Sequence, residues 1–160
     1  MRILLPIDGS ELALHEVRFA IRLVQDGLRA DFLLTNVQEP ASLYEMVVVP
    51  DPEALGTISH DAGEHILQEA CHLLDAHGLA YETEIVTGDP VQALVELIER
   101  QQCELVVMGD RNPSPLLGAL QGSVAHSLAH AAPVPVLLVK APVDNSADTQ
   151  ADTLDAEEES

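Results

Sequence analysis

Aromatic and basic residues are scarce in this chain of 160 residues. Aromatic side chains make up 2 % of it, Trp is absent, and Lys140 is the single lysine. The core is therefore expected to consist of Leu, Val, Ile and Ala, and so few aromatics disfavour a flavin-binding or redox α/β module. Cys71 and Cys103 lack the spacing of a metal or redox motif, so we expect structural thiols.

Long apolar runs are also missing. None approaches the roughly 18 residues of a membrane span, and the apolar start of the chain is too short for a signal peptide. We therefore expect a cytoplasmic protein. A length of 160 residues is typical of one domain that buries a sizeable core.

The charge is strongly one-sided. Acidic residues number 27 and basic residues 7, which gives a formal charge of −20. Such a polyanion repels nucleic acid and anionic lipid, so neither nucleic acid nor a membrane is an expected partner. Residues 142–160 are acidic with almost nothing to bury, and we expect a disordered tail after a domain at residues 1–141.

Strand and helix signals alternate along the domain. Strand-like apolar runs occupy residues 3–7, 31–37, 81–86, 105–108 and 134–139, and helical patterns are expected at residues 11–26, 59–77, 90–101 and 122–132. Ser10 and Asp89 are suited to cap helices. Residues 41–56 are interpreted as a long connection, and the helix after them is expected to turn Ala62, Ile66, Ala70 and Leu73 inward. The βαβαβαβαβ order predicts a parallel sheet covered by helices on both faces.

Three strand ends of such a sheet are predicted to form one crevice. Ligands of parallel sheets bind at the carboxyl ends of strands, where the strand order reverses. The ends available are the turn Asp8-Gly9-Ser10, Val37, and Gly109, where a loop is expected to open. That loop closes at Gly122-Ser123, the start of a helix, where unpaired N–H groups and the helix dipole favour an anion.

The loop pattern Gly109-x2-Asn112-x9-Gly122-Ser123 resembles the nucleotide loop of the universal stress protein family, Gly-x2-Gly-x9-Gly-Ser/Thr. Residues 2–140 as a whole are similar to that family, including the Asp8-Gly9-Ser10 turn and the helix start at Thr87-Gly88-Asp89-Pro90. The resemblance implies a doubly wound five-stranded parallel sheet with strand order 3-2-1-4-5, of the adenine nucleotide alpha-hydrolase-like class. It also implies a stress-response regulator that is a homodimer joined through the last strand, Val134 to Val139, and that acts on a protein partner not yet identified.

The resemblance further implies a site for ATP or a related adenine nucleotide, accompanied by Mg²⁺. Asp8 would contact ribose or a phosphate-bound metal, and the backbone of Val37 would contact adenine. The phosphate path would be lined by Gly109, Arg111 and Asn112, with backbone N–H groups from Gly122, Ser123 and Val124. Pro6, Ile7 and Met108 complete the predicted set.

The loop departs from the family pattern at its middle glycine. Asn112 stands there, and Asn is the best substitute for Gly in a left-handed conformation. Pro113 and Pro115 each remove an N–H donor and stiffen the loop. Arg111 is the single basic residue of the loop and is well suited to phosphate.

Other interpretations of these residues stay open. Gly109 and Gly122 would serve equally as turn and helix-packing glycines beside an empty loop, and Asp8 as the centre of an Asx turn. The chain would then be a non-nucleotide-binding homodimer that acts through protein contacts. His126 and His130 have a spacing able to bind one metal ion, but no third ligand is near in sequence, so no metal site is predicted.

Catalytic motifs are absent from the sequence. There is neither a Gly-x4-Gly-Lys-Ser/Thr loop nor a Gly-x-Ser-x-Gly elbow. Only Arg111 is available to stabilise a transferring phosphoryl group. We therefore predict no enzyme activity beyond very weak ATP hydrolysis.

Overall fold

The computed structural model describes residues 1–40, 52–110 and 124–140. The predicted site residues Arg111, Asn112, Gly122 and Ser123 and the acidic tail at residues 142–160 lie outside the described residues. The elements, in chain order, are β1 (Arg2–Pro6), α1 (Glu11–Gln25), β2 (Asp31–Gln38), α3 (Pro52–Ala76), β3 (Tyr81–Thr87), α4 (Pro90–Arg100), β4 (Leu105–Asp110), α5 (Val124–Ala131) and β5 (Val136–Lys140). Within these ranges no helix combines the length and the apolar character that crossing a bilayer demands.

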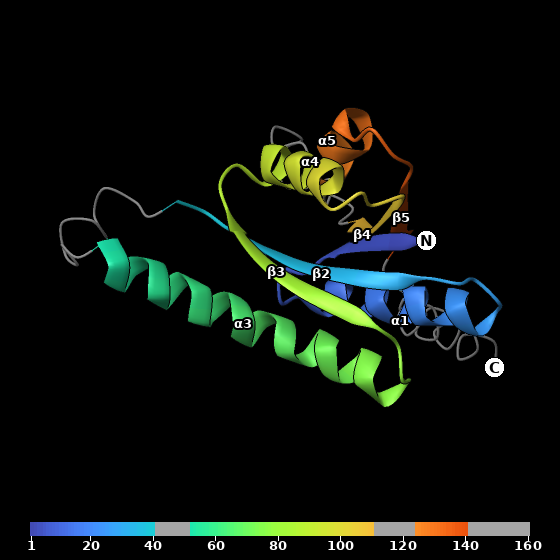
Figure 1. The fold of residues 1–160 in the computed structure, drawn as a ribbon. Helices are drawn as coiled ribbons and strands as arrows, with labels where there is room; N and C mark the ends of the chain where they lie inside the picture. Colours follow the sequence, from blue (N-terminus) through green and yellow to red (C-terminus); the bar gives the residue numbers. More distant parts are fainter. Residues whose placement is uncertain (41–51, 111–123, 141–160) are drawn as a thin grey trace, which may run out of the picture.

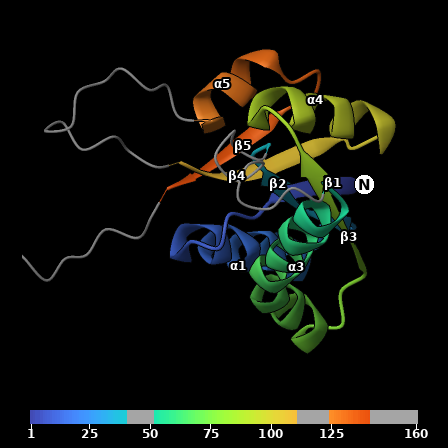
Figure 2. The same ribbon diagram turned by 90° about the vertical axis from the view of Figure 1, so that its left-hand side faces the viewer.

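The sheet has five strands in the order β3-β2-β1-β4-β5, and all its neighbouring strands are parallel (Figure 1). Helices α1 and α3 cover one face, and α4 and α5 cover the other, as both views show (Figure 2). The predicted fold class and strand order are therefore confirmed. The chain reverses direction across the sheet between β1 and β4, which is where open sheets of this kind bind ligands.

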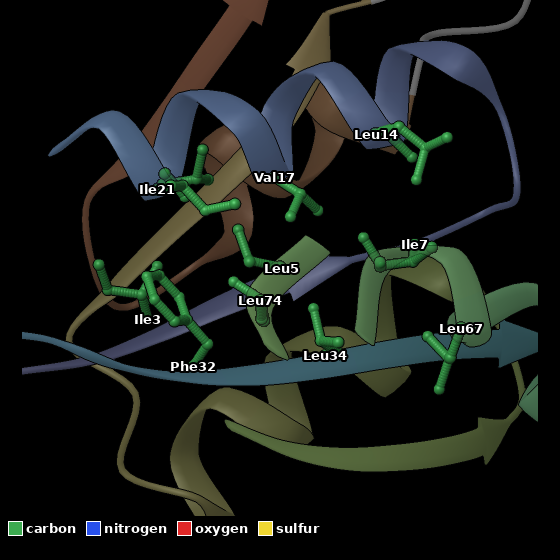
Figure 3. Packing of buried hydrophobic residues seen from close by; sticks show 14 of the residues in the cluster. Ile3, Leu5, Ile7, Leu14, Val17, Ile21, Phe32, Leu34, Leu67 and Leu74 are labelled. Carbon is green, nitrogen blue, oxygen red and sulfur yellow. The ribbon is translucent and has the colours of Figure 1, made fainter. Parts of the chain in front are cut away.

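Two apolar clusters flank the sheet because successive residues of β1 point to opposite faces. Ile3, Leu5 and Ile7 pack towards α1 and α3, whereas Leu4 packs towards α4 and α5. Helix α1 contributes Val17 and other residues of the stripe that its spacing predicts (Figure 3). Aliphatic side chains fill both clusters, with Phe32 as the one fully buried aromatic in the described part of the chain.

Helix α3 is longer than the sequence predicted. It begins at Pro52, so interpreting residues 52–56 as connection was wrong. Proline is well tolerated in the first turn of a helix, which accounts for this start. Its buried row is Gly63, Leu67, Ala70 and Leu74. Of the predicted inward residues, Ala70 is buried and Ile66 and Leu73 are partly buried against the core, whereas the prediction for Ala62 was wrong, because it is exposed. A Cβ atom at Gly63 would lie 3.0 Å from the side chain of Ile85, so the backbone of the helix approaches β3 closely.

Strand β4 continues to Asp110, two residues further than predicted. The expectation that the loop opens at Gly109 was wrong, because β5 continues to pair with β4 at Gly109↔Val139 and at the next position. On its other side β4 pairs with β1 only at Ile3↔Leu105 and Leu4↔Val106. The two strands therefore separate before Gly109, and the separation opens the sheet at its carboxyl end.

Candidate functional site

A cavity of about 410 Å³ lies at the carboxyl end of the sheet, beside the point where β1 and β4 separate. Its volume is within the range of small-molecule sites, about 300–1,000 Å³. The lining includes seven residues of the predicted set, namely Pro6, Ile7, Asp8, Val37, Met108, Gly109 and Val124. The structure thus brings the three predicted strand ends to one cavity. The first residues of α5 close the side that lies next to β4.

The turn after β1 forms part of the cavity wall. The backbone N–H of Ser10 donates to Oδ1 of Asp8 at 2.9 Å, which is an Asx turn, and Gly9 between them has a φ of 80°. The Ser10 hydroxyl accepts from the N–H of Ala13 at 3.2 Å and caps α1 as predicted. Asp8 is exposed and lines the cavity, so the Asx turn and a ligand contact are compatible roles.

Asn36 lines the cavity and holds the ends of β1 and β2 together. It is buried, and its Nδ2 donates to the carbonyl of Ile7 at 2.7 Å. The N–H of Ile7 donates to the carbonyl of Thr35, also at 2.7 Å, and Gln38 donates its side-chain amide to Oδ1 of Asn36. These bonds fix the backbone next to Val37, the residue that the family resemblance assigns to adenine.

Glu16 is a cavity residue that the sequence did not predict. It lines the cavity, yet only 1 % of it is exposed. Its Oε2 accepts a hydrogen bond from the backbone N–H of Gly109. Gly109 lies beyond the last residue pair that joins β4 to β1, Leu4↔Val106, so β1 supplies no acceptor for this N–H group. Its Oε1 is buried and has no hydrogen-bond partner among residues 1–40, 52–110 and 124–140. Burial raises the pKa of Glu16 well above its usual range, the Gly109 N–H acts in the opposite direction, and the charge of Asp8 adds to the rise.

Gly109 is required for the close approach of α1 to β4. A Cβ atom there would lie 2.5 Å from Cγ of Leu12 and 3.3 Å from Oε2 of Glu16. Real Cβ atoms do not approach other atoms to 2.5 Å, so no larger residue fits without movement. Gly109 therefore packs against helix α1, as the alternative interpretation of it as a helix-packing glycine predicts. It also lines the cavity.

A second buried acid lies on the other face of the sheet. Asp110 is 6 % exposed, and its Oδ1 is 3.7 Å from Nδ1 of His126 on α5. His126 and His130 are both exposed. In the described part of the chain no three His, Cys, Asp or Glu side chains cluster as ligands for a metal ion.

The electrostatics of the cavity oppose a strongly negative ligand. Its described lining contains two acids, Asp8 and Glu16, and neither Lys nor Arg. Any phosphate group would therefore depend on backbone N–H groups and on Arg111, which lies outside the described residues. The ionisation state of Glu16 decides how negative the inner wall is.

A signal for Glu16 was present in the sequence. The apolar stripe of α1 includes Ala13, Val17 and Ala20, and Glu16 lies within that stripe, four residues before Ala20. A charged residue on the buried side of an amphipathic helix requires a partner. The sequence does not identify that partner, because Gly109 is 93 residues away.

Comparison with known proteins identifies the family. Residues 1–140 match the model of the universal stress protein family, and the chain belongs to that family. A universal stress protein of Methanocaldococcus jannaschii is 27 % identical over 141 residues, which cover 88 % of this chain and 82 % of the relative.

Solved structures of the family share the fold. A universal stress protein in complex with cAMP is 28 % identical, has a TM-score of 0.63, and is matched over 87 % of this chain and 95 % of the other. A family member of Arabidopsis thaliana with AMP bound is 18 % identical, has a TM-score of 0.62, and is matched over 93 % and 97 % of the two chains. The fold of this chain is therefore the adenine nucleotide alpha-hydrolase-like fold of its family.

Proposed function

We propose that this universal stress protein binds an adenine nucleotide in the cavity at the carboxyl ends of β1, β2 and β4, and acts as a nucleotide-linked regulator in a stress response. The convergence of Asp8, Val37 and Gly109 on one cavity carries the proposal. A relative of 28 % identity in complex with cAMP supports the choice of an adenine nucleotide.

The described residues fit a nucleoside better than a triphosphate. The cavity has the volume of a small-molecule site, and Met108 and Val124 give it apolar walls. In our proposal the Val37 backbone contacts adenine, and Asp8 contacts ribose or an accompanying Mg²⁺ ion. The phosphate groups would be bound by Arg111, Asn112, Gly122 and Ser123. In this loop Asn112, Pro113 and Pro115 replace a glycine-rich pattern. We propose no catalytic role for these residues.

Nucleotide binding is tested first on the purified protein. Bound nucleotide is extracted and identified by mass spectrometry, and ATP, AMP and cAMP are then titrated in a calorimeter. We expect binding of at least one of them with a dissociation constant in the micromolar range. Failure of all three to bind, together with no extracted nucleotide, would refute the proposed function.

A substitution at Asp8 tests where the nucleotide lies. Asp8→Asn keeps an oxygen that accepts from the Ser10 N–H, so the turn is retained while the charge is lost. We expect a several-fold loss of affinity and a loss of any Mg²⁺ dependence. The matched control is Asp61→Asn, which removes the same charge from an exposed position on α3 outside the cavity lining.

The second candidate function is regulation through protein–protein contacts by a homodimer that binds no nucleotide. Strand β5 lies at the edge of the sheet, and its Leu137 is 37 % exposed. An apolar edge strand favours pairing with another chain. We propose that two copies associate along this edge, whether or not a nucleotide is bound.

The dimer is tested by light scattering. We expect twice the chain mass of 17.2 kDa, and a shift towards the monomer in Leu137→Lys. Thr83→Lys is the matched control, because Thr83 is exposed on β3, the opposite edge strand. A monomer mass for the unmodified chain at micromolar concentration would rule the dimer out.

A further inference from the structure

We propose that Glu16 is a specificity-determining residue of the cavity, which admits an anionic ligand while its carboxyl is neutral and repels it once the carboxyl is ionised. The inference rests on the proposed function, because it assumes that the ligand is an adenine nucleoside or nucleotide. It adds a residue outside the predicted set and a rule for the charge of the ligand.

The position of Glu16 carries the proposal. Its side chain extends from α1 to the backbone N–H of Gly109, at a level of β4 beyond its pairing with β1. That backbone is part of the cavity wall. Any phosphate group that follows the predicted path past Gly109 therefore passes next to the Glu16 carboxyl.

The carboxyl of Glu16 has one oxygen satisfied and one unused. Oε2 accepts from the Gly109 N–H, and Oε1 is buried without a hydrogen-bond partner in the part of the chain that the structure describes. A buried carboxylate normally accepts several hydrogen bonds, whereas a neutral carboxyl needs fewer. The single bond that Glu16 accepts is therefore suited to the neutral form.

The described residues around Glu16 contain little that would stabilise its charge. From the turn after β1, Asp8 contributes a like charge, and from β4 the Gly109 N–H contributes an opposing dipole. Helix α3 and strand β5 face α1 with apolar side chains such as Leu67 and Val139. Asp110 and His126 contact each other on the opposite face of the sheet. Burial thus keeps the proton on Glu16 to a higher pH than on an exposed glutamate.

A phosphate in the cavity and an ionised Glu16 would repel each other. Even at a separation of about 10 Å and an effective dielectric constant of about 20, repulsion between two unit charges lowers affinity by roughly tenfold, and a shorter separation lowers it further. An anionic ligand should therefore favour the protonated form and take up a proton where Glu16 is ionised in the free protein. A neutral nucleoside should bind with little dependence on this proton.

The test compares cAMP with adenosine between pH 5.5 and 8.5. The cyclic phosphate is a diester with a single negative charge throughout this range, whereas a monoester such as AMP loses a second proton near a pH of about 6. Calorimetry in two buffers of different ionisation enthalpy gives both the affinity and the number of protons taken up. The full-length chain, Glu16→Gln and Glu11→Gln are measured in parallel.

We expect the affinity of the unmodified chain for cAMP to fall by roughly tenfold relative to adenosine as the pH rises through the titration of Glu16. Proton uptake should accompany cAMP binding in that range. Glu16→Gln keeps an acceptor for the Gly109 N–H and should show neither effect. Glu11→Gln removes a carboxylate from the exposed first turn of the same helix and should behave like the unmodified chain.

Each outcome of this test separates the two proposals. If the chain binds cAMP with a pH dependence and proton uptake that Glu16→Gln leaves unchanged, the role of Glu16 is refuted and the proposed function stands. If neither cAMP nor adenosine binds at any pH, the role of Glu16 is refuted, and the titrations with ATP and AMP decide the proposed function. If Glu16→Gln does not fold, the proton uptake of the unmodified chain decides, since equal uptake with cAMP and adenosine would refute the role of Glu16.

Discussion

Glu16 accepts a hydrogen bond from the backbone N–H of Gly109, and this bond joins helix α1 to strand β4 beyond the point where β4 stops pairing with β1. A strand that loses its neighbour leaves N–H groups without acceptors, and buried N–H groups need acceptors. In this chain an acidic side chain supplies one. The same bond brings a carboxyl into the wall of the cavity. Glu16 therefore both satisfies the Gly109 N–H and places a titratable group beside the ligand site.

Removal of the Glu16 carboxyl should destabilise the fold. In Glu16→Ala the Gly109 N–H loses its acceptor, and the unsatisfied group costs about 1–3 kcal/mol of unfolding free energy. Glu16→Gln retains an acceptor and should be much closer to the unmodified chain. Urea unfolding at pH 6 measures both. Glu69→Ala, at an exposed position of α3, is the control and should change the stability by less than about 0.5 kcal/mol. Equal stability of Glu16→Ala and the control would contradict this role of the bond.

The pH dependence of stability should carry the signature of Glu16. Burial raises the pKa of Glu16 in the folded chain, so between the unfolded value of about 4.3 and the folded value the native state holds a proton that the unfolded state has lost. The contribution of Glu16 is therefore fully present below the unfolded pKa, and it is lost progressively as the pH rises to the folded pKa.

The measurement is the difference in unfolding free energy between the unmodified chain and Glu16→Gln, taken every half unit from pH 4 to pH 9. We expect Glu16→Gln to gain relative to the unmodified chain as the pH rises, and the gain to level off above the folded pKa of Glu16. The difference cancels titration at the other acids. A difference that is constant across the range would show that Glu16 titrates alike in both states.

Gly109→Ala should strain the contact between α1 and β4. The added Cβ would lie 2.5 Å from Cγ of Leu12, and overpacking of this kind typically costs about 1–3 kcal/mol. The double variant with Leu12→Ala should recover part of that loss, because the nearest clashing atoms are then gone. Thermal unfolding of the two single variants and the double variant forms a mutant cycle. Strict additivity of the two changes would exclude Leu12 as the source of the strain.

Asp89→Ala should weaken helix α4 at its start. Oδ1 of Asp89 accepts from the N–H groups of Val91 and Gln92, at 3.1 and 3.0 Å, and loss of such a cap costs about 1 kcal/mol. Asp89→Ser supplies another capping oxygen and should retain most of the stability. Chemical denaturation of the three proteins tests this. Equal losses in the alanine and serine variants would mean that the cap does not act through these bonds.

Local signals were sufficient for most of the fold. Asp89 followed by Pro90 identified the start of α4, and Ser10 identified the start of α1, because both act on backbone groups only two or three residues away. The start of α3 was missed although Asp51 and Pro52 repeat the Asp-Pro pattern of α4, because Pro50 and Pro52 were interpreted as a break in the chain after an apolar run. The end of β4 was missed because Gly109 reads as a turn residue, whereas its pairing with Val139 keeps it in the strand.

The sequence by itself determined the alternation of strands and helices, the family, and the three strand ends at which a ligand is expected. These properties follow from periodicity, capping and motif spacing, all of which act over short stretches of chain. Only the tertiary structure decided that Gly109 lies against Leu12 and Glu16, and that a buried acid forms part of the cavity wall. Those contacts depend on where β4 separates from β1. That separation results from the packing of the whole sheet, and no local pattern in the sequence encodes it.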